Sequence, residues 1–257
     1  MLLSGLPRTG ATVLGSIFAQ NPDVHFSGHS PLVPLVHGVK EATEGAAREN
    51  LIMLNKYDGF AKRAMQNMVN FYYQDVDAPT IIDKGRSWCC EANRYYAKEC
   101  FEGNEKHIIL VRPLDEIVKS FVALRQANHW NGDIFSDLLD EGSDPIMWPL
   151  TGVFYSKFMD CKDTLFLSFK DVVDDTKNTL NRISDFLGIN RFDYCLTEIQ
   201  EAVAHNDGFL SLNGLHDVRK TVSARNYNIE LPSHIQQKCD EYNNRMINLG
   251  ITFGLTG

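Results

Sequence analysis

The sequence lacks the long apolar runs and the paired cysteines that mark several classes of protein. No segment approaches the ~20 continuous apolar residues of a membrane span. Its 6 cysteines form no repeated CxxC pair, so we expect buried thiols in a reducing compartment. Residues 1–20 have no basic n-region, and Pro7 and Arg8 interrupt their apolar run, so this segment is not typical of a signal peptide. These absences predict a cytoplasmic protein with no membrane partner.

The sequence also lacks an excess of positive charge. It has 25 Lys and Arg residues against 33 Asp and Glu residues, a formal net charge of −8. A negative protein surface opposes non-specific binding to nucleic acid or to anionic membranes. We therefore predict no nucleic-acid partner, and any anionic ligand must be held by a local cationic pocket.

No internal repeat, low-complexity tract or linker rich in Pro and Gly divides the chain. Its 257 residues, 44% of them apolar, can fill one continuous core, so we predict a single domain over residues 1–257. The segment 204–231 is polar and has no clear period. A loop of that length in a compact domain is usually functional or mobile.

Short apolar runs rich in Ile, Val, Leu and Phe alternate with longer stretches of helical spacing. This alternation is typical of βα units around a parallel sheet buried on both faces, and it predicts an α/β fold. Strands are predicted at Met1–Leu3, Thr80–Ile82, His107–Val111 and Thr164–Phe169. Helices are predicted at roughly 10–20, 45–75, 88–100, 114–127, 145–161, 175–187 and 232–248, with Gly59 dividing the second.

The segment SGLPRTGATVLGSIF, which begins at Ser4, places a glycine-containing loop between the first predicted strand and the first predicted helix. Open α/β sheets bind ligands at this edge, and the N-terminus of the helix favours a phosphate or sulfate. Arg8 adds a cation with bidentate geometry, and Thr9 and Thr12 add hydroxyl donors. The loop therefore favours an anion site, with an ordinary turn capped by Thr9 as the alternative.

This loop departs from the nucleotide-binding pattern GxxxxGK[ST]. Gly5 and Gly10 have the right separation, but Ala11 stands where the pattern has its lysine. No lysine of the loop can therefore reach the β- and γ-phosphates of a nucleoside triphosphate. A P-loop-like kinase or nucleotide hydrolase is accordingly a disfavoured alternative.

Three segments together resemble one known family. GLPRTGATVL resembles the 5′-phosphosulfate loop of the sulfotransferases that use 3′-phosphoadenylyl sulfate (PAPS), whose pattern is approximately PRSGTT or PKSGTT. HIILVRPLDEIVKSF resembles their 3′-phosphate motif, and TLFLSFKDVVDDTKNTLNRISDFLGI resembles their fourth strand and the helix after it. The loop is most similar to the tyrosylprotein and bacterial types. The resemblance implies a three-layer, P-loop-like fold with a central parallel sheet of about four to five strands flanked by helices, and no metal ion.

The resemblance assigns a donor site residue by residue. It implies that the first loop holds the 5′-phosphosulfate of PAPS, and that adenosine 3′,5′-bisphosphate (PAP) is the product. The residues assigned in this loop are Arg8, Thr9, Gly10, Ala11, Thr12 and Val13. Arg112 and Ser120 are assigned to the 3′-phosphate, with Arg219 and Lys220 as a supplement. From the residues alone, Arg112 could instead pair with Asp115, and a charge run such as that around Arg219 is usually a solvated surface.

Sulfuryl transfer requires cations at the leaving group and a base that faces the acceptor. The resemblance implies His29 as the base, since it aligns with a catalytic glutamate of the tyrosylprotein enzymes and an imidazole accepts a proton at neutral pH. It implies Lys84 and Arg8 as the catalytic cations. A turn hydrogen bond for His29 and a surface position for Lys84 are the alternatives.

The acceptor is expected to be a hydroxyl or an amine. A peptide tyrosine, a carbohydrate and a small molecule are all compatible with the sequence, which leaves both the acceptor and the oligomeric state open. A protein that binds PAPS or PAP without turnover is a further alternative to the enzyme.

Overall fold

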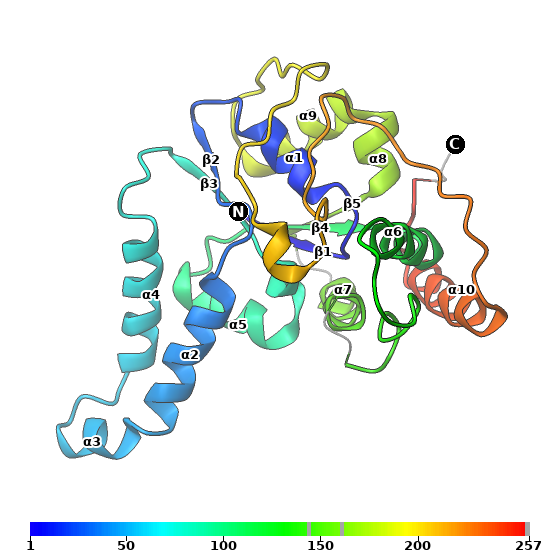
Figure 1. The fold of residues 1–257 in the computed structure, drawn as a ribbon. Helices are drawn as coiled ribbons and strands as arrows, with labels where there is room; N and C mark the ends of the chain where they lie inside the picture. Colours follow the sequence, from blue (N-terminus) through cyan, green and yellow to red (C-terminus); the bar gives the residue numbers. More distant parts are fainter. Residues whose placement is uncertain (143–144, 160–161, 255–257) are drawn as a thin grey trace.

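The computed structural model describes residues 1–142, 145–159 and 162–254, which are built around a five-stranded parallel sheet (Figure 1). The order of the strands is β2-β3-β1-β4-β5. The strands are β1 (Leu2–Gly5), β2 (Val24–Phe26), β3 (Thr80–Lys84), β4 (His107–Val111) and β5 (Thr164–Ser168). The predicted α/β fold with a central parallel sheet is confirmed.

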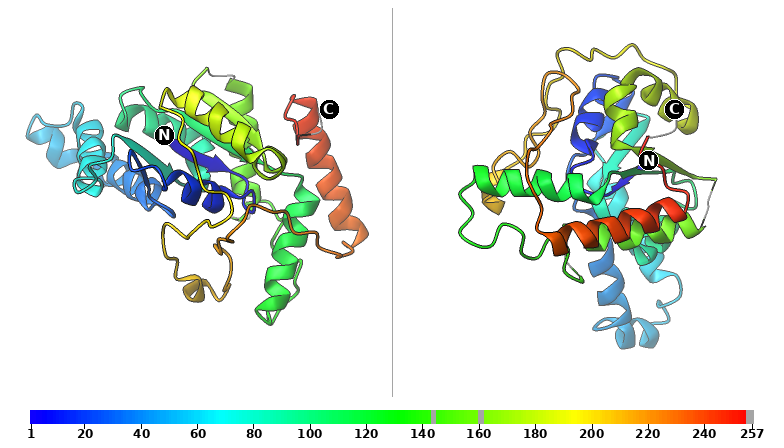
Figure 2. Two further views of the ribbon diagram at one scale, coloured as in Figure 1. Left: turned by 90° about the horizontal axis from the view of Figure 1, so that it is seen from above. Right: turned by 90° about the vertical axis from the view of Figure 1, so that its right-hand side faces the viewer.

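Helices connect the strands and cover both faces of the sheet (Figure 2). The first six helical elements are α1 (Ala11–Phe18), α2 (Leu32–Glu44), α3 (Arg48–Met53), α4 (Phe60–Tyr72), η1 (Arg86–Cys89) and α5 (Glu91–Cys100). The remainder are α6 (Leu114–Ala127), α7 (Met147–Met159), α8 (Phe169–Asp174), α9 (Thr176–Leu187), η2 (Asp207–Leu210) and α10 (Ser233–Asn248). Helices α2, α3 and α4 extend away from the sheet as an arm.

Strands β1 and β4, in the middle of the sheet, bury every residue, and this explains their largely apolar sequence. Along β4, Ile108 and Leu110 belong to the core that includes residues of α1, α8 and α9. Ile109 and Val111 belong to the core that includes residues of α6, α7 and α10. Because successive side chains of a strand point to opposite faces of the sheet, one apolar run supports two cores.

Several element boundaries differ from the predicted ones, although Gly59 divides the second predicted helix as expected. The expected helix 45–75 is α3 and α4, and α4 follows Gly59, whose φ of 65° ends the preceding turn. Strand β2 and helix α2 were not predicted, since β2 has only 3 residues. The last strand ends at Ser168, because the side chains of Ser168 and Asp171 form a capping box that begins α8. Residues 160 and 161, at the end of the expected helix 145–161, lie outside the described residues.

Two findings bear on the expected environment of the protein. Within the described ranges, no helix combines the length and the apolar character needed to cross a membrane. The 5 cysteines that the structure describes carry no disulfide bond.

Candidate active site

A cavity of ≈ 400 Å³ lies at the carboxyl edge of the sheet. Its wall comes from the loop between β1 and α1, the ends of β3 and β4, helices α6 and α8, and the segment 204–231. Every predicted site residue except Lys220 lines this cavity. The carboxyl edge of the sheet thus brings together side chains that are more than 200 residues apart in the sequence.

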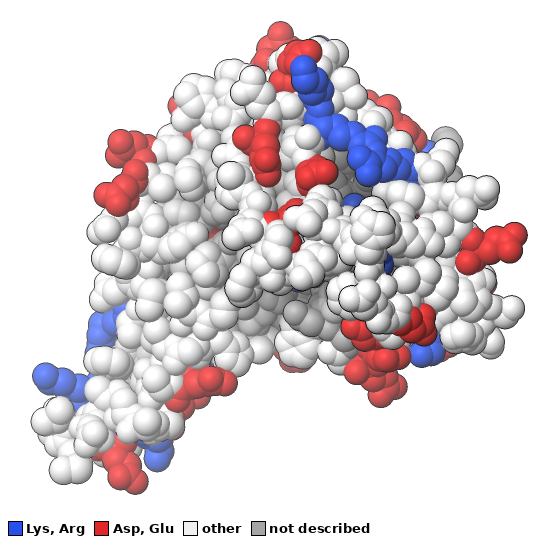
Figure 3. Space-filling view, in the orientation of Figure 1, with Lys and Arg blue, Asp and Glu red and all other residues white. Residues whose placement is uncertain are grey.

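The cavity is cationic although the protein is acidic. Among the described residues that line it, six are positively charged, and Asp217 is the one carboxylate. The six are Arg8, Lys84, Arg86, Arg112, Arg219 and Arg225. Figure 3 shows Lys and Arg side chains gathered beside a hollow on this face of the molecule. This is the local cationic pocket that an anionic ligand of an acidic protein requires.

The loop between β1 and α1 is shaped by two glycines. Gly5 has a φ of 112°, and a Cβ atom built on it would lie 2.3 Å from the carbonyl oxygen of Leu110. Gly10, with a φ of 80°, is the N-cap of α1, and no side chain caps the helix. The first backbone N–H groups of α1 therefore face the cavity without a side-chain acceptor, which suits an anion.

Thr9 does not cap the helix, which was its role in the alternative interpretation of this loop as an ordinary turn. Its side chain is buried, and its hydroxyl donates a hydrogen bond of 2.8 Å to the carbonyl oxygen of Leu6. The hydroxyl thus stabilises the turn itself and does not cap α1. Any contact between Thr9 and a ligand would use its backbone.

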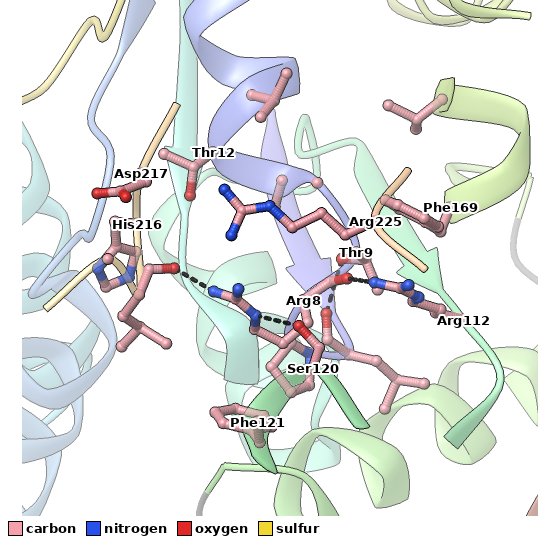
Figure 4. A pocket seen from close by; sticks show the side chains of 18 of the residues that line it. Arg8, Thr9, Thr12, Arg112, Ser120, Phe121, Phe169, His216, Asp217 and Arg225 are labelled. Carbon is pink, nitrogen blue, oxygen red and sulfur yellow. Dashed lines mark hydrogen bonds between the residues drawn. The ribbon is translucent and has the colours of Figure 1, made fainter. Parts of the chain in front are cut away.

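Arg8 joins the first loop to helix α6 (Figure 4). Its Nε atom donates a hydrogen bond of 2.9 Å to Ser120 Oγ, and its Nη1 atom donates to the carbonyl oxygen of Leu215. Its own carbonyl oxygen accepts a hydrogen bond of 2.8 Å from Arg112 Nη1. Burial lowers the pKa of Arg8. The guanidinium group is therefore desolvated and held in one orientation.

Arg112 is fixed from three sides. Its Nε atom lies 2.8 Å from Glu116 Oε2, and its guanidinium carbon lies 3.9 Å from the centre of the Phe169 ring. The Arg8 carbonyl described above is the third contact. Asp115, the partner that the sequence alternative suggested, pairs with Lys119 instead at 3.3 Å. The Arg112 side chain is 6% exposed and stays at the cavity wall.

Lys84, at the end of β3, is buried and not a surface residue. It is 8% exposed, and its Nζ atom donates a hydrogen bond of 2.8 Å to Thr12 Oγ1 at the start of α1. Burial lowers the pKa of Lys84 to about 7, and the nearby cations Arg86 and Arg8 act in the same direction, whereas Asp207 raises it. The amine therefore exchanges protons near neutral pH and responds to any charge brought into the cavity.

The loop after β2 brings His29 to the same cavity. Its neighbour Ser30 donates a side-chain hydrogen bond of 2.6 Å to Asp83 and a backbone hydrogen bond of 3.0 Å to the carbonyl of Lys84. Asp83 also accepts hydrogen bonds from Tyr73 and from Trp88. His29 and Lys84 are thus anchored together through the end of β3.

Comparison with known proteins identifies the family. A model of the sulfotransferase family matches residues 2–193. This chain belongs to the sulfotransferase family. No curated protein matches it by sequence.

Three solved sulfotransferase structures resemble the fold of this family member. The sulfotransferase domain from the Synechococcus PCC 7002 olefin synthase is 17% identical, with a TM-score of 0.61 over 96% of this chain and 93% of that one. The domain from the curacin biosynthetic pathway is 17% identical, with a TM-score of 0.54 over 94% and 96%. A sulfotransferase from Alicyclobacillus acidocaldarius is 9% identical, with a TM-score of 0.57 over 98% and 94%. At these identities the likeness shows the fold, in agreement with the predicted P-loop-like architecture.

The segment 204–231 supplies part of this sulfotransferase's cavity, but not all of its predicted residues. Arg219 lines the cavity and donates a hydrogen bond of 3.0 Å to Ser223. Lys220 does not line it, because its side chain is 78% exposed and pairs with Glu198 at 3.2 Å. The expectation that Lys220 supports a phosphate site therefore has no structural basis.

Sequence reasoning left several lining residues of the sulfotransferase without a role. Arg225 extends into the same space as Arg8 and Arg112 (Figure 4). Tyr227 accepts a hydrogen bond of 3.4 Å from Ser120, and His216 forms part of the opposite wall. A segment without periodicity gives no sign of which side chains turn inward, so only the cluster of charges around Arg219 hinted at them. In the part of the sulfotransferase that the structure describes, no group of three His, Cys, Asp or Glu residues could hold a metal ion.

Proposed function

We propose that this protein transfers a sulfuryl group from PAPS to a hydroxyl or amine acceptor. The observation that carries the proposal is the meeting of the α1 N-terminus, Arg8, Lys84 and Arg112 in one cavity of a sulfotransferase-family chain. Five described cysteines without a disulfide support a reducing, cytoplasmic location.

The residues of the cavity suit the charge of this donor. PAPS carries about four negative charges near neutral pH, since a phosphate monoester alone contributes up to about two. The backbone N–H groups of residues 10–13, with Arg8 and Thr12, would hold the 5′-phosphosulfate. Arg112 and Ser120, with Arg219 and Arg225, would hold the 3′-phosphate. Six cations against one carboxylate make this assignment electrostatically favourable.

The catalytic residues stabilise the charge of the leaving group and remove one proton from the acceptor. Lys84 and Arg8 neutralise the negative charge that builds up on the departing phosphate oxygen. His29 takes the proton of the acceptor while the bond between the acceptor atom and sulfur forms and the bond between sulfur and the phosphate oxygen breaks. Positioning and electrostatics supply most of the rate in a transfer of this kind.

A binding experiment tests the donor site first. PAP is expected to raise the melting temperature of the protein equally with and without EDTA, and adenosine 5′-monophosphate is expected to bind more weakly. Arg112→Ala should reduce the preference for PAP over the monophosphate, because only PAP has a 3′-phosphate. Stabilisation that requires both ATP and magnesium would instead favour a kinase or nucleotide hydrolase.

Transfer of labelled sulfate from PAPS distinguishes the enzyme from a protein that only binds the nucleotide. A panel of phenols, alcohols, sugars and amines serves as acceptors. Transfer to any of them supports the proposal, and binding of PAP without transfer to any of them supports the binding protein.

A further inference from the structure

A carboxylate–imidazole pair lies in the segment 204–231, beside His29, the proposed base. Asp207 Oδ1 lies 2.6 Å from His216 Nδ1, and Asp207 Oδ2 accepts a hydrogen bond of 2.8 Å from the backbone N–H of His216. Both oxygens of one carboxylate thus hold the same residue. His216 lines the cavity (Figure 4), whereas Asp207 is not one of the residues that line it.

The imidazole ring of His216 is also held on its faces and edges. The ring of His205 stacks on it with centroids 4.3 Å apart and planes 16° from parallel. The ring of His29 meets it at 69°, with centroids 5.8 Å apart. His205 is itself held by Glu201, whose Oε1 atom lies 3.3 Å from His205 Nδ1. The two nitrogen atoms of His216 therefore have defined positions.

We propose that His216, oriented by Asp207, is a second general base of the sulfuryl transfer, with Nε2 as the atom that takes the acceptor's proton. The inference rests on the proposed function and adds a catalytic residue to it. A neutral imidazole that donates its Nδ1 proton to a carboxylate has its lone pair on Nε2. Nε2 lies on the ring edge turned away from Asp207, and the described residues give it no hydrogen-bond partner.

The step is balanced without a further reactant. The acceptor oxygen or nitrogen forms a bond to sulfur, the bond from sulfur to the phosphate oxygen breaks, and PAP leaves with the electron pair. The acceptor's proton moves to Nε2, and Asp207 stabilises the resulting imidazolium. His29 and His216 face the same space, so the proton can move to either ring, depending on where the acceptor lies.

Burial keeps His216 neutral until a donor is present. Burial lowers its pKa to about 4, and Lys84 and His205 act in the same direction, whereas Asp207 raises the pKa. Arg86, Asp217 and His29 are the other ionisable groups on the adjoining walls. An anionic donor raises the pKa of His216 toward neutrality, and a base whose pKa is nearer the working pH is more effective.

Kinetics in two backgrounds test the proposal. His216→Asn and Asp207→Asn are compared with the wild type and within His29→Asn, using labelled PAPS and any acceptor that the panel identifies. His216→Asn is expected to lower kcat by about 10- to 100-fold in at least one background, because general bases contribute about that much or more. Asp207→Asn is expected to lower kcat in the same background. Both variants should bind PAP with an unchanged Kd.

Asp217→Asn is the matched control. It removes one carboxylate charge close to His216 in sequence, from the cavity wall itself, without touching His216 Nδ1, so it should change kcat much less than Asp207→Asn does. A change of less than tenfold for His216→Asn in both backgrounds would overturn the proposal. An equal effect of the two aspartate variants would overturn the orienting role of Asp207.

A second measurement needs no acceptor. NMR of the imidazole nitrogens in the PAP-bound protein should show His216 with its proton on Nδ1 and should show that Asp207→Asn shifts this proton toward Nε2. An Nε2-protonated His216 in the wild type overturns the proposal. If the wild type binds PAP but transfers sulfate to no acceptor, the proposed function fails, and the NMR result still tests the orientation of His216.

Discussion

Arg8 Nε donates a hydrogen bond of 2.9 Å to Ser120 Oγ across 112 residues of sequence. The carbonyl oxygen of Arg8 also accepts a hydrogen bond from Arg112. One arginine therefore connects the loop after β1 with the end of β4 and the middle of α6. Direct hydrogen bonds therefore join the proposed 5′-phosphosulfate loop to the proposed 3′-phosphate residues.

Ser120→Ala should weaken PAP binding by about 5- to 20-fold, because the loss of a hydrogen bond to a charged group costs about 1–2 kcal/mol. Isothermal titration calorimetry measures the change in Kd. Ser233→Ala, an exposed serine at the start of α10, is the control and should leave the Kd unchanged. An unchanged Kd for Ser120→Ala would mean that Arg8 keeps its orientation without this partner.

PAP binding should take up a proton through Lys84. Burial holds the pKa of Lys84 at about 7, and a bound anion favours the charged amine, so the affinity should fall as the pH rises above that value. Calorimetry at about pH 8, where phosphate with a second pKa near 6 is ionised, in buffers of different ionisation enthalpy measures the uptake. Lys84→Met should abolish the contribution of this group. Buffer-independent binding in the wild type would contradict the prediction.

Gly5→Ala should destabilise the protein by about 2–4 kcal/mol, because a side chain at this φ is strained and would clash with the strand next to it. Gly38→Ala is the opposite case, since Gly38 lies within α2 and a Cβ atom there would have no neighbour within 4 Å. It should stabilise the protein by about 0.5–1 kcal/mol. Urea unfolding of both variants measures the two free energies, and effects of the same sign would contradict the argument.

Asp83→Asn should lower the free energy of unfolding by about 2–4 kcal/mol. Asp83 is 2% exposed and accepts hydrogen bonds from Ser30, Tyr73 and Trp88, whereas an asparagine has one acceptor oxygen and turns an NH₂ group toward one of these donors. Urea unfolding tests this, with the exposed Asp23→Asn as the control. Equal stabilities of the two variants would show that the network around Asp83 adjusts to the amide.

The sequence predicted those parts of the fold that depend on local periodicity. The alternation of apolar runs with helical spacing located β1, β3, β4 and β5 because buried parallel strands need continuous apolar residues. Strand β2 was missed because three residues carry no measurable period. The loop GLPRTGATVL was recognisable since its function depends on backbone and glycine positions that follow one another in the chain.

The contacts of the charged side chains could not be predicted in the same way. Asp115 and Glu116 are adjacent in sequence, yet only Glu116, one helical turn from Arg112, reaches its guanidinium group. Arg219 and Lys220 are also adjacent, and the backbone turns one toward the cavity and the other toward Glu198. Neighbouring residues in an irregular segment point in different directions for reasons that only tertiary packing sets.

The sequence by itself determined the order of the βα units, the glycine-containing loop and the family, because these depend on residues that are close together in the chain. The tertiary structure decided that Arg8 bonds to Ser120, that Lys84 is buried enough to titrate near neutrality, and that Asp207 orients His216 beside His29. Each of these depends on segments brought together by the sheet edge and on the water excluded between them. Burial and distance, the two quantities that set the chemistry of a charged group, exist only in the folded chain.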